Sequence, residues 1–144
     1  MVKVRTYQSS DYPSLKQILA SSDMFDVTWD SETNFASMQL LNPEAIQVAE
    51  IDDQVVGLII IDHHGRETSF FYRLAVLEAH RGTGVGSALL KKAEEIARLM
   101  GTKEVAVYVD ADNTIIQKFY TMKGYQTSGK KFICMYKSVD KAYA

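Results

Sequence analysis

The hydrophobic spacing of this chain changes abruptly at Gly84, and this change limits the folds that it can adopt. Residues 70–77 are a short run rich in aromatic and aliphatic side chains, which is typical of a strand. From Gly84 onward, apolar residues recur at steps of three and four as far as Met100, which predicts a helix that Gly101 ends. Residues 80–87 join the two and contain three glycines. The chain therefore contains a strand, a tight turn and its longest helix in direct succession.

The part of the chain before this succession predicts a strand, two helices and a hairpin. Residues 2–6 alternate apolar and polar side chains, as a half-buried strand does. A first helix is expected from residues 9–13, and a second after a cap at Asp30 or Ser31. Residues 46–51 and 55–61 are two β-rich runs around a turn. The expected apolar stripes are Leu15, Ile18 and Leu19 in the first helix and Phe35, Met38 and Leu41 in the second.

The part after the long helix predicts two more strands and one more helix. Valines alternate along residues 103–109, which indicates a strand, and Asn113 is placed to cap a short helix that stops at Gly124. Residues 132–136 are expected to form a last strand. The order β-α-α-β-β-β-α-β-α-β is that of an α/β fold with a mixed, mostly antiparallel sheet flanked by helices. No linker or repeat divides the chain, so we expect one domain over residues 1–144.

Composition excludes several classes of protein. The net charge of -2 is too low in positive charge to favour nucleic acid as a partner, and no apolar run reaches the ~18 residues that span a bilayer. The single cysteine, Cys134, cannot form an internal disulfide, so we expect a soluble cytoplasmic protein in which this residue lies in the core. His63 and His64 are adjacent and would point to opposite faces of a strand, which disfavours a metal site.

Charge is unevenly distributed along the sequence. Residues 17–65 contain nine acidic residues and no Lys or Arg, so this segment carries -9 and the remainder carries +7. Such a division is expected of a protein with two ligands of opposite charge. It is also expected of an acidic surface that simply faces water, and the sequence leaves both interpretations open.

The glycine-rich segment, residues 80–87, has the character of an anion-binding turn. Backbone N–H groups at the start of a helix and the helix dipole favour a phosphate, although the same glycines also suit a turn with no ligand. A Walker loop is excluded because residues 86–88 read Gly-Ser-Ala, without the required lysine. A dinucleotide fingerprint is excluded because Ser87 stands where its last glycine would be, and no series of parallel βα units surrounds it.

The spacing of Arg81, Gly84 and Gly86 resembles the signature of the GNAT family of N-acetyltransferases: Arg or Gln, two residues, Gly, one residue, then Gly or Ala. The resemblance covers residues 70–136 and includes residues 74–76, which look like part of the family's fourth strand. Residues 1–65 match the family only in the order of their elements. Downstream, the matching positions are Asn113, Phe119, Tyr120, Lys123, Gly124 and Tyr125.

This resemblance implies a GNAT-like fold, acetyl-CoA as cofactor and direct attack of a primary amine on the thioester. It implies that Tyr120 is the general acid for the departing thiol, and that Arg81 helps to hold phosphate. Asn113 is either a helix cap or a polar contact to the cofactor arm. The implied cofactor-binding residues are Gly82, Thr83, Gly84, Val85, Gly86 and Ser87 for the pyrophosphate and Leu74, Ala75 and Val76 for the pantetheine.

The acceptor side and the general base are less well defined. Some family members carry a glutamate as general base where this chain has Phe70, so Glu67 or Tyr72 acting through water are the remaining candidates for the base.

Carboxylates and aromatic rings around residues 23–32 suit a cationic acceptor such as a polyamine, an aminoglycoside or a basic peptide. A protein N-terminus or lysine as acceptor, and a sensor that binds acyl-CoA without catalysis, are the alternatives. A homodimer is common in the family. The expected acceptor-binding residues are Phe25, Asp26, Trp29, Asp30 and Tyr72.

Overall fold

A computed structural model describes residues 1–63 and 67–140 of the chain. It forms two compact units, one from Met1 to Tyr108 and the other from Val109 onward, and each is described by itself. His64 lies outside the described residues. None of the described helices is long and apolar enough to cross a membrane.

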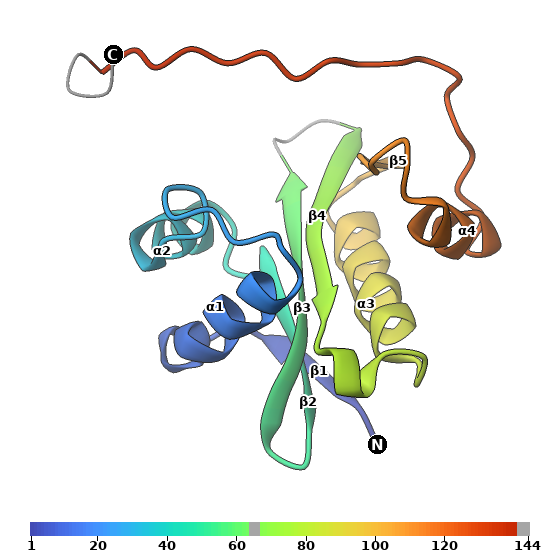
Figure 1. Ribbon diagram of the computed structural model, residues 1–144. Coiled ribbons are helices and arrows are strands. Elements are labelled where there is room, and N and C mark those ends of the chain that lie inside the picture. The colour runs from blue at the N-terminus through green and yellow to red at the C-terminus, as the bar shows by residue number, and fades with distance from the viewer. Residues whose placement is uncertain (64–66, 141–144) are drawn as a thin grey trace. The chain divides into compact units, whose positions relative to one another are not determined.

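The first unit is built on one five-stranded mixed sheet (Figure 1). Its strands follow chain order across the sheet. The first four pair antiparallel, and the fifth pairs parallel with the fourth, as expected when a helix crosses over between two strands. The predicted mixed, mostly antiparallel sheet flanked by helices is therefore confirmed. The strands are β1 (Lys3–Thr6), β2 (Ile46–Ile51), β3 (Gln54–His63), β4 (Thr68–Val76) and β5 (Glu104–Val107).

Helices cover both faces of this sheet. Helices α1 (Tyr12–Ser21) and α2 (Glu32–Leu41) lie on one face, and α3 (Val85–Leu99) lies on the other (Figure 1). Ser31 caps α2, its hydroxyl accepting a hydrogen bond from the Asn34 N–H at 3.1 Å. Two single turns of 3-10 helix, η1 (Ser9–Asp11) and η2 (Glu78–His80), precede α1 and the glycine-rich segment.

Leu41 does not belong to the apolar stripe of α2. It is 88% exposed, whereas Phe35 and Met38 pack against the core. Leu41 is the last residue of the helix, where the chain turns away through Asn42. The predicted stripe is thus correct for its first two members and wrong for the third.

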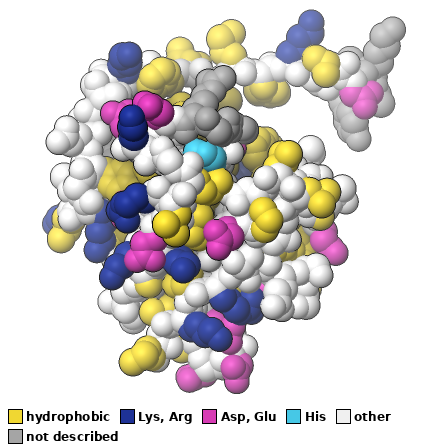
Figure 2. Space-filling model, turned by 180° about the vertical axis from the view of Figure 1, so that it is seen from behind, with side chains coloured by type: hydrophobic (Ala, Val, Ile, Leu, Met, Phe, Trp, Pro, Cys, Tyr) yellow, Lys and Arg dark blue, Asp and Glu magenta, His cyan; other side chains and the backbone are white. Residues whose placement is uncertain are grey.

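The second unit contains one helix and a segment without regular structure. Helix α4 (Thr114–Met122) is capped by Asn113 as predicted, but the predicted strand over residues 132–136 is not formed. Phe132 is 69% and Tyr136 94% exposed, and hydrophobic side chains stand along this segment in Figure 2. A strand needs a neighbouring strand to satisfy its N–H and C=O groups, and none of the described strands pairs with residues 125–140. Cys134 is exposed, so its expected place in the core is also wrong.

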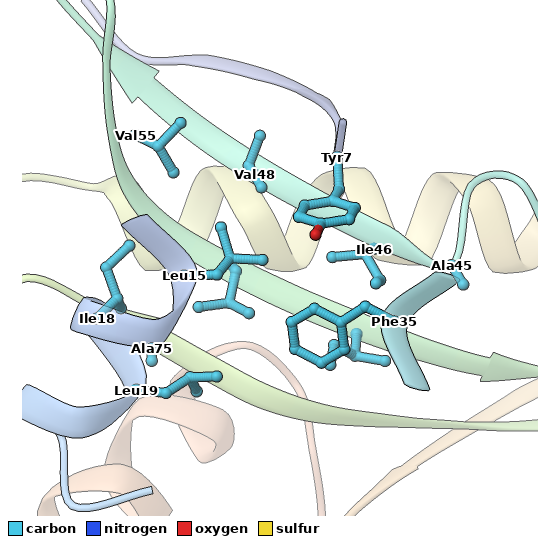
Figure 3. Close-up of a cluster of buried hydrophobic side chains, with 12 residues drawn as sticks. Tyr7, Leu15, Ile18, Leu19, Phe35, Ala45, Ile46, Val48, Val55 and Ala75 are labelled. Carbon is cyan, nitrogen blue, oxygen red and sulfur yellow. The ribbon is translucent and has the colours of Figure 1, made fainter. Parts of the chain in front are cut away.

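The core beneath α1 and α2 holds both helices on the sheet and so fixes both ends of the segment that joins them. Leu15 and Leu19 of α1 and Phe35 of α2 are fully buried against Ile46 of β2 (Figure 3). The ring of Tyr7 meets Phe35 edge to face with centroids 5.8 Å apart. Burial of several such side chains at roughly 1.5–3 kcal/mol each is ample to hold both helices on the sheet.

Helix α3 approaches the opposite face closely at its N-terminal end. A Cβ added at Gly57 of β3 would lie 3.0 Å from the Ala75 carbonyl oxygen and 3.1 Å from Leu89 Cδ1. Only glycine lets the first turns of α3 come this near to β3 and β4. The start of α3 is therefore seated next to the C-terminal half of β4, where the glycine-rich segment begins.

Candidate active site

Strand β4 carries a bulge that separates two differently paired halves. Leu58 of β3 pairs with Ala75, but Ile60 pairs with Tyr72, so β4 has one extra residue between these pairs. Arg73 lies in the bulge with a φ of 56°, a left-handed backbone conformation that residues other than glycine rarely adopt. A bulge of this kind interrupts the regular pairing of its strand.

Beyond the bulge, one edge of β4 is open. Strand β5 pairs with β4 only as far as Phe71, which is opposite Val107. From there to the end of β4, none of the described strands pairs with the edge that faces β5. This stretch includes Leu74, Ala75 and Val76. Apart from the Val76 carbonyl, which accepts a hydrogen bond from Arg81, the backbone groups on this edge are available to the amide groups of an extended ligand.

The glycine-rich segment leads into α3 with its backbone exposed. Gly82 and Gly84 have φ values of 74° and 89°, and nothing lies within 4 Å of a Cβ added at either. Gly84 is the residue that precedes the helix, and no side chain caps it. The N–H groups of Val85, Gly86 and Ser87 have no carbonyl one turn earlier in the helix to bind. They form, with the helix dipole, a site that suits a phosphate.

Arg81 ties this segment to the neighbouring elements. Its Nε donates to the Val76 carbonyl at 2.9 Å, and its Nη2 donates to the Ser22 hydroxyl at 3.3 Å. Thr83 also donates its hydroxyl proton within the segment, to the His80 carbonyl. Arg81 therefore holds the end of β4 against the residue that follows α1.

The segment between α1 and α2 is folded tightly on its own carboxylates. Asp26 Oδ1 accepts hydrogen bonds from the N–H groups of Trp29 at 2.8 Å and Thr28 at 2.9 Å, which lowers the pKa of this carboxyl. The ring of Phe25 lies 5.5 Å below the ammonium of Lys16. Asp26 and Phe25 thus already have polar and cationic partners inside the protein.

Asp30 is buried and paired with the bulge of β4. It is 1% exposed, and its carboxylate accepts from Arg73 Nε at 3.0 Å and from the Asp26 N–H at 2.8 Å. Next to it, the ring of Trp29, 52% exposed, meets Tyr72 at 6.2 Å between centroids and an angle of 74°. The structure therefore brings together three of the expected acceptor residues, Trp29, Asp30 and Tyr72.

Sequence reasoning missed Asp62 and Tyr108. Tyr72 donates a hydrogen bond to Asp62 Oδ2, and burial, with this bond, raises the pKa of Tyr72 above its usual value. Phe70, opposite Asp62 on the sheet, stacks parallel on Tyr108 with centroids 5.8 Å apart. The signal was strand alternation. Tyr72, Phe70 and Asp62 follow a period of two with buried Ile60, and such residues share one face.

Glu67, a candidate general base, and His63, weighed as a metal ligand, bind other residues of the protein. Glu67 forms an exposed ion pair with Lys103 at 3.0 Å. His63 Nδ1 lies 2.9 Å from Ser69 Oγ, and Thr102 completes this polar cluster at 3.1 Å. Over residues 1–63 and 67–140, no group of three His, Cys, Asp or Glu could hold a metal ion.

Tyr120 and Asn113 belong to the second unit. Asn113 acts as a cap, its Oδ1 accepting from the Ile116 N–H at 3.1 Å, and it also lines an open hollow of about 460 Å³ over residues 110–115. Tyr120 is buried against Phe119 and Tyr125, with ring centroids 5.3 and 5.2 Å away. Burial raises the pKa of Tyr120 to about 12, so its hydroxyl keeps its proton at neutral pH.

Comparison with known proteins agrees with this geometry. The model of the acetyltransferase (GNAT) family matches residues 4–125, so the chain belongs to this family. An acetyltransferase of Yersinia enterocolitica is 26% identical over 99% of this chain and 100% of its own length. An acetyltransferase of Yersinia pestis is 25% identical over the same shares.

Solved structures share the fold. The PaiA N-acetyltransferase of Thermoplasma acidophilum, in complex with coenzyme A, has a TM-score of 0.78 at 17% identity and covers 91% of this chain and 93% of its own. A putative acetyltransferase of Agrobacterium tumefaciens has a TM-score of 0.74 at 22% identity, covering 94% and 99%. The protein is an acetyltransferase that uses acetyl-CoA, and the open β4 edge and the uncapped start of α3 fit that cofactor.

Proposed function

We propose that this enzyme transfers an acetyl group from acetyl-CoA to a primary amine of a cationic small molecule, by direct attack of the amine. The observation that carries the proposal is the hydrogen bond from Tyr72 to Asp62, next to the ring of Trp29. Tyr72 lies two residues before Leu74, on the same strand β4. A carboxylate bordered by aromatic rings suits an ammonium group.

The cofactor-binding residues in this proposal come from the two backbone features of the first unit. The N–H groups of residues 82–87 receive the pyrophosphate, and residues 74–76 receive the two amides of the pantetheine arm. When bound, acetyl-CoA supplies an acetyl group activated as a thioester. Arg81 contributes by fixing the segment, since its guanidinium already binds Val76 and Ser22.

The acceptor amine must lose a proton before it can attack. An alkyl ammonium has a pKa near ~10.4, so about one molecule in a thousand is neutral at pH 7. Tyr72 donates to Asp62, which leaves the lone pairs of its hydroxyl oxygen for an acceptor N–H. We assign Asp62 as the base: the ammonium proton passes to the Tyr72 oxygen while the Tyr72 proton passes to Asp62. A carboxylate is a weaker base than an amine, so this transfer is unfavourable by itself and is completed by the attack on the thioester, which consumes the neutral amine. The amine becomes neutral and Asp62 becomes a carboxylic acid.

Tyr120 stands at the position where the family resemblance implies a general acid, and its raised pKa limits that role. A free thiol has a pKa near ~8.5, well below the value of about 12 that burial gives Tyr120. Full proton transfer from Tyr120 to the departing sulfur is therefore uphill. We assign Tyr120 as a hydrogen-bond donor that stabilises the developing negative charge, and the sulfur takes its final proton from solvent.

The location and the acceptor class are part of the same proposal. An exposed, unpaired Cys134 and a thiol product suit the reducing cytoplasm. A cationic acceptor suits the nine acidic residues of residues 17–65. A protein N-terminus or lysine is the competing acceptor.

An acceptor screen tests this proposal. We expect thiol release from acetyl-CoA to be fastest with a diamine or polyamine, slower with a neutral monoamine of equal length, and slowest with an amino acid that carries a carboxylate. The preference should weaken at high salt, because ionic attraction at exposed sites is screened. Higher kcat/KM for a peptide, or for a neutral or anionic amine at low salt, would exclude the cationic small molecule.

A further inference from the structure

We propose that the ion pair between Asp30 and Arg73 positions the acceptor site. It fixes the segment between α1 and α2, residues 23–31, here called the acceptor loop, on the bulge of β4. The position of Trp29 against Tyr72 then depends on this pair. The inference rests on the proposed function, since the acceptor loop matters for catalysis only if an acceptor binds beside it.

The Asp30 side of the pair is fully enclosed. With 1% exposure, its carboxylate needs partners within the protein, and it has Arg73 Nε at 3.0 Å and the Asp26 N–H at 2.8 Å. The Asp30 carbonyl accepts a further bond from the Tyr12 hydroxyl at 2.7 Å. Both the side chain and the backbone of Asp30 are therefore anchored, one to β4 and the other to α1.

The Arg73 side of the pair depends on the bulge. A left-handed backbone at a non-glycine residue persists when its surroundings fix it, and here the side chain is held by a buried carboxylate. The bulge lies between Tyr72, which faces the proposed acceptor, and residues 74–76, which face the proposed cofactor. One residue thus connects the acceptor loop to the strand that serves both substrates.

Hydrogen bonds around Trp29 link its position to that of Asp30. Asp26 accepts from the Trp29 N–H at 2.8 Å, and Asn34 Nδ2 donates to the Trp29 carbonyl at 2.6 Å. Because Asp26 is also bound to Asp30, displacement of Asp30 would move Trp29 with it. The contact between Trp29 and Tyr72, at 6.2 Å, would then be lost.

Trp29 is the only tryptophan of the chain, so its fluorescence reports on the acceptor loop directly. The test compares wild type with Asp30→Asn, which keeps the shape and removes the charge, and with Arg73→Lys, which keeps the charge and removes the Nε donor. Lys103→Gln, which breaks the exposed pair with Glu67, is the matched control. Each is assayed for acceptor KM, acetyl-CoA KM, kcat, thermal unfolding and acrylamide quenching of Trp29.

We expect Asp30→Asn and Arg73→Lys to raise the acceptor KM about tenfold and to increase quenching of Trp29, with acetyl-CoA KM within about twofold of wild type. The control should change neither. A lower unfolding temperature with unchanged acceptor KM and quenching would make the pair only structural and overturn the inference. If Asp30→Asn does not fold, Arg73→Lys decides. Wild type that acetylates no amine would contradict the proposed function instead, and quenching would still test the anchor.

Discussion

Replacing Gly84 by glutamate is expected to abolish measurable binding of acetyl-CoA, whereas the same replacement at Gly101 is expected to leave binding intact. The two glycines stand at opposite ends of α3, with φ values of 89° and 90°, and a Cβ at either meets nothing within 4 Å. Backbone strain and added charge are therefore matched. Only the replacement at Gly84 would place a carboxylate at the uncapped N-terminus of the helix, where it would compete with phosphate and repel it.

Isothermal titration calorimetry with acetyl-CoA measures this difference, and circular dichroism confirms that both variants are folded. Similar losses in the two variants would assign the effect to backbone strain. Equal affinity in Gly84→Glu and wild type would exclude the start of α3 as the phosphate site.

Replacing Asp62 by asparagine is expected to lower kcat/KM for the acceptor by about 10²- to 10⁴-fold at neutral pH, the usual contribution of a general base. Asparagine still accepts the hydrogen bond of Tyr72 but cannot take the proton. The pH dependence should change as well. In wild type, kcat/KM should change little with pH across the neutral range, below the pKa of the amine. In the variant it should rise about tenfold per pH unit, following the neutral amine.

Two further variants serve as controls for this pH profile. Asp53→Asn removes the same charge at the opposite end of β3, in the turn to β2, and should behave as wild type. Tyr120→Phe should lower kcat but keep the wild-type pH profile, because a hydroxyl whose pKa burial raises to about 12 stays protonated throughout. A level profile in Asp62→Asn would contradict the assignment of Asp62 as the base.

Much of the fold could be predicted because its elements carry strong periodic patterns. The spacing indicated Val85, Leu89, Ala93, Ile96 and Met100 as the apolar stripe of this helix. Helix α3 buries the first four, and Met100 follows the helix as its C-cap and is half-buried. Residues 46–51 form β2 as predicted, and Asp52 and Asp53 make the turn with left-handed backbones, which aspartate tolerates better than most residues. Local sequence patterns were sufficient to predict these elements.

The candidate site was harder to predict because its contacts depend on register. A bulge at Arg73 cannot be recognised in the run of aromatic and aliphatic residues 70–77, yet Arg73 forms its ion pair with Asp30 from this bulge. From the sequence, Asp30 was therefore expected to cap a helix or to bind the acceptor, and Asp62, near the end of its strand, was not selected as a site residue. The missing strand over residues 132–136 shows the same limit, because a short apolar run predicts a strand but does not supply a neighbouring strand for it.

The uneven charge of the sequence does not separate acidic from basic side chains on the face of the protein that Figure 2 shows. On the face drawn in Figure 2, Lys and Arg side chains stand among Asp and Glu side chains. Asp26, Asp30 and Glu50 of the acidic segment are bound to partners in the protein, Glu50 to Arg5 at 2.6 Å. Asp62 also has a partner, since it accepts a hydrogen bond from Tyr72.

The most direct test of amine acetylation is to follow acetyl-CoA and a polyamine together with the wild-type enzyme. Thiol release is read by a chromogenic reagent, and the amine is analysed by mass spectrometry in the same samples. We predict one N-acetylated amine for each thiol released, and no release above the uncatalysed rate when the amine is omitted. Thiol release that is independent of every amine tested, with no acetylated product, would contradict the account.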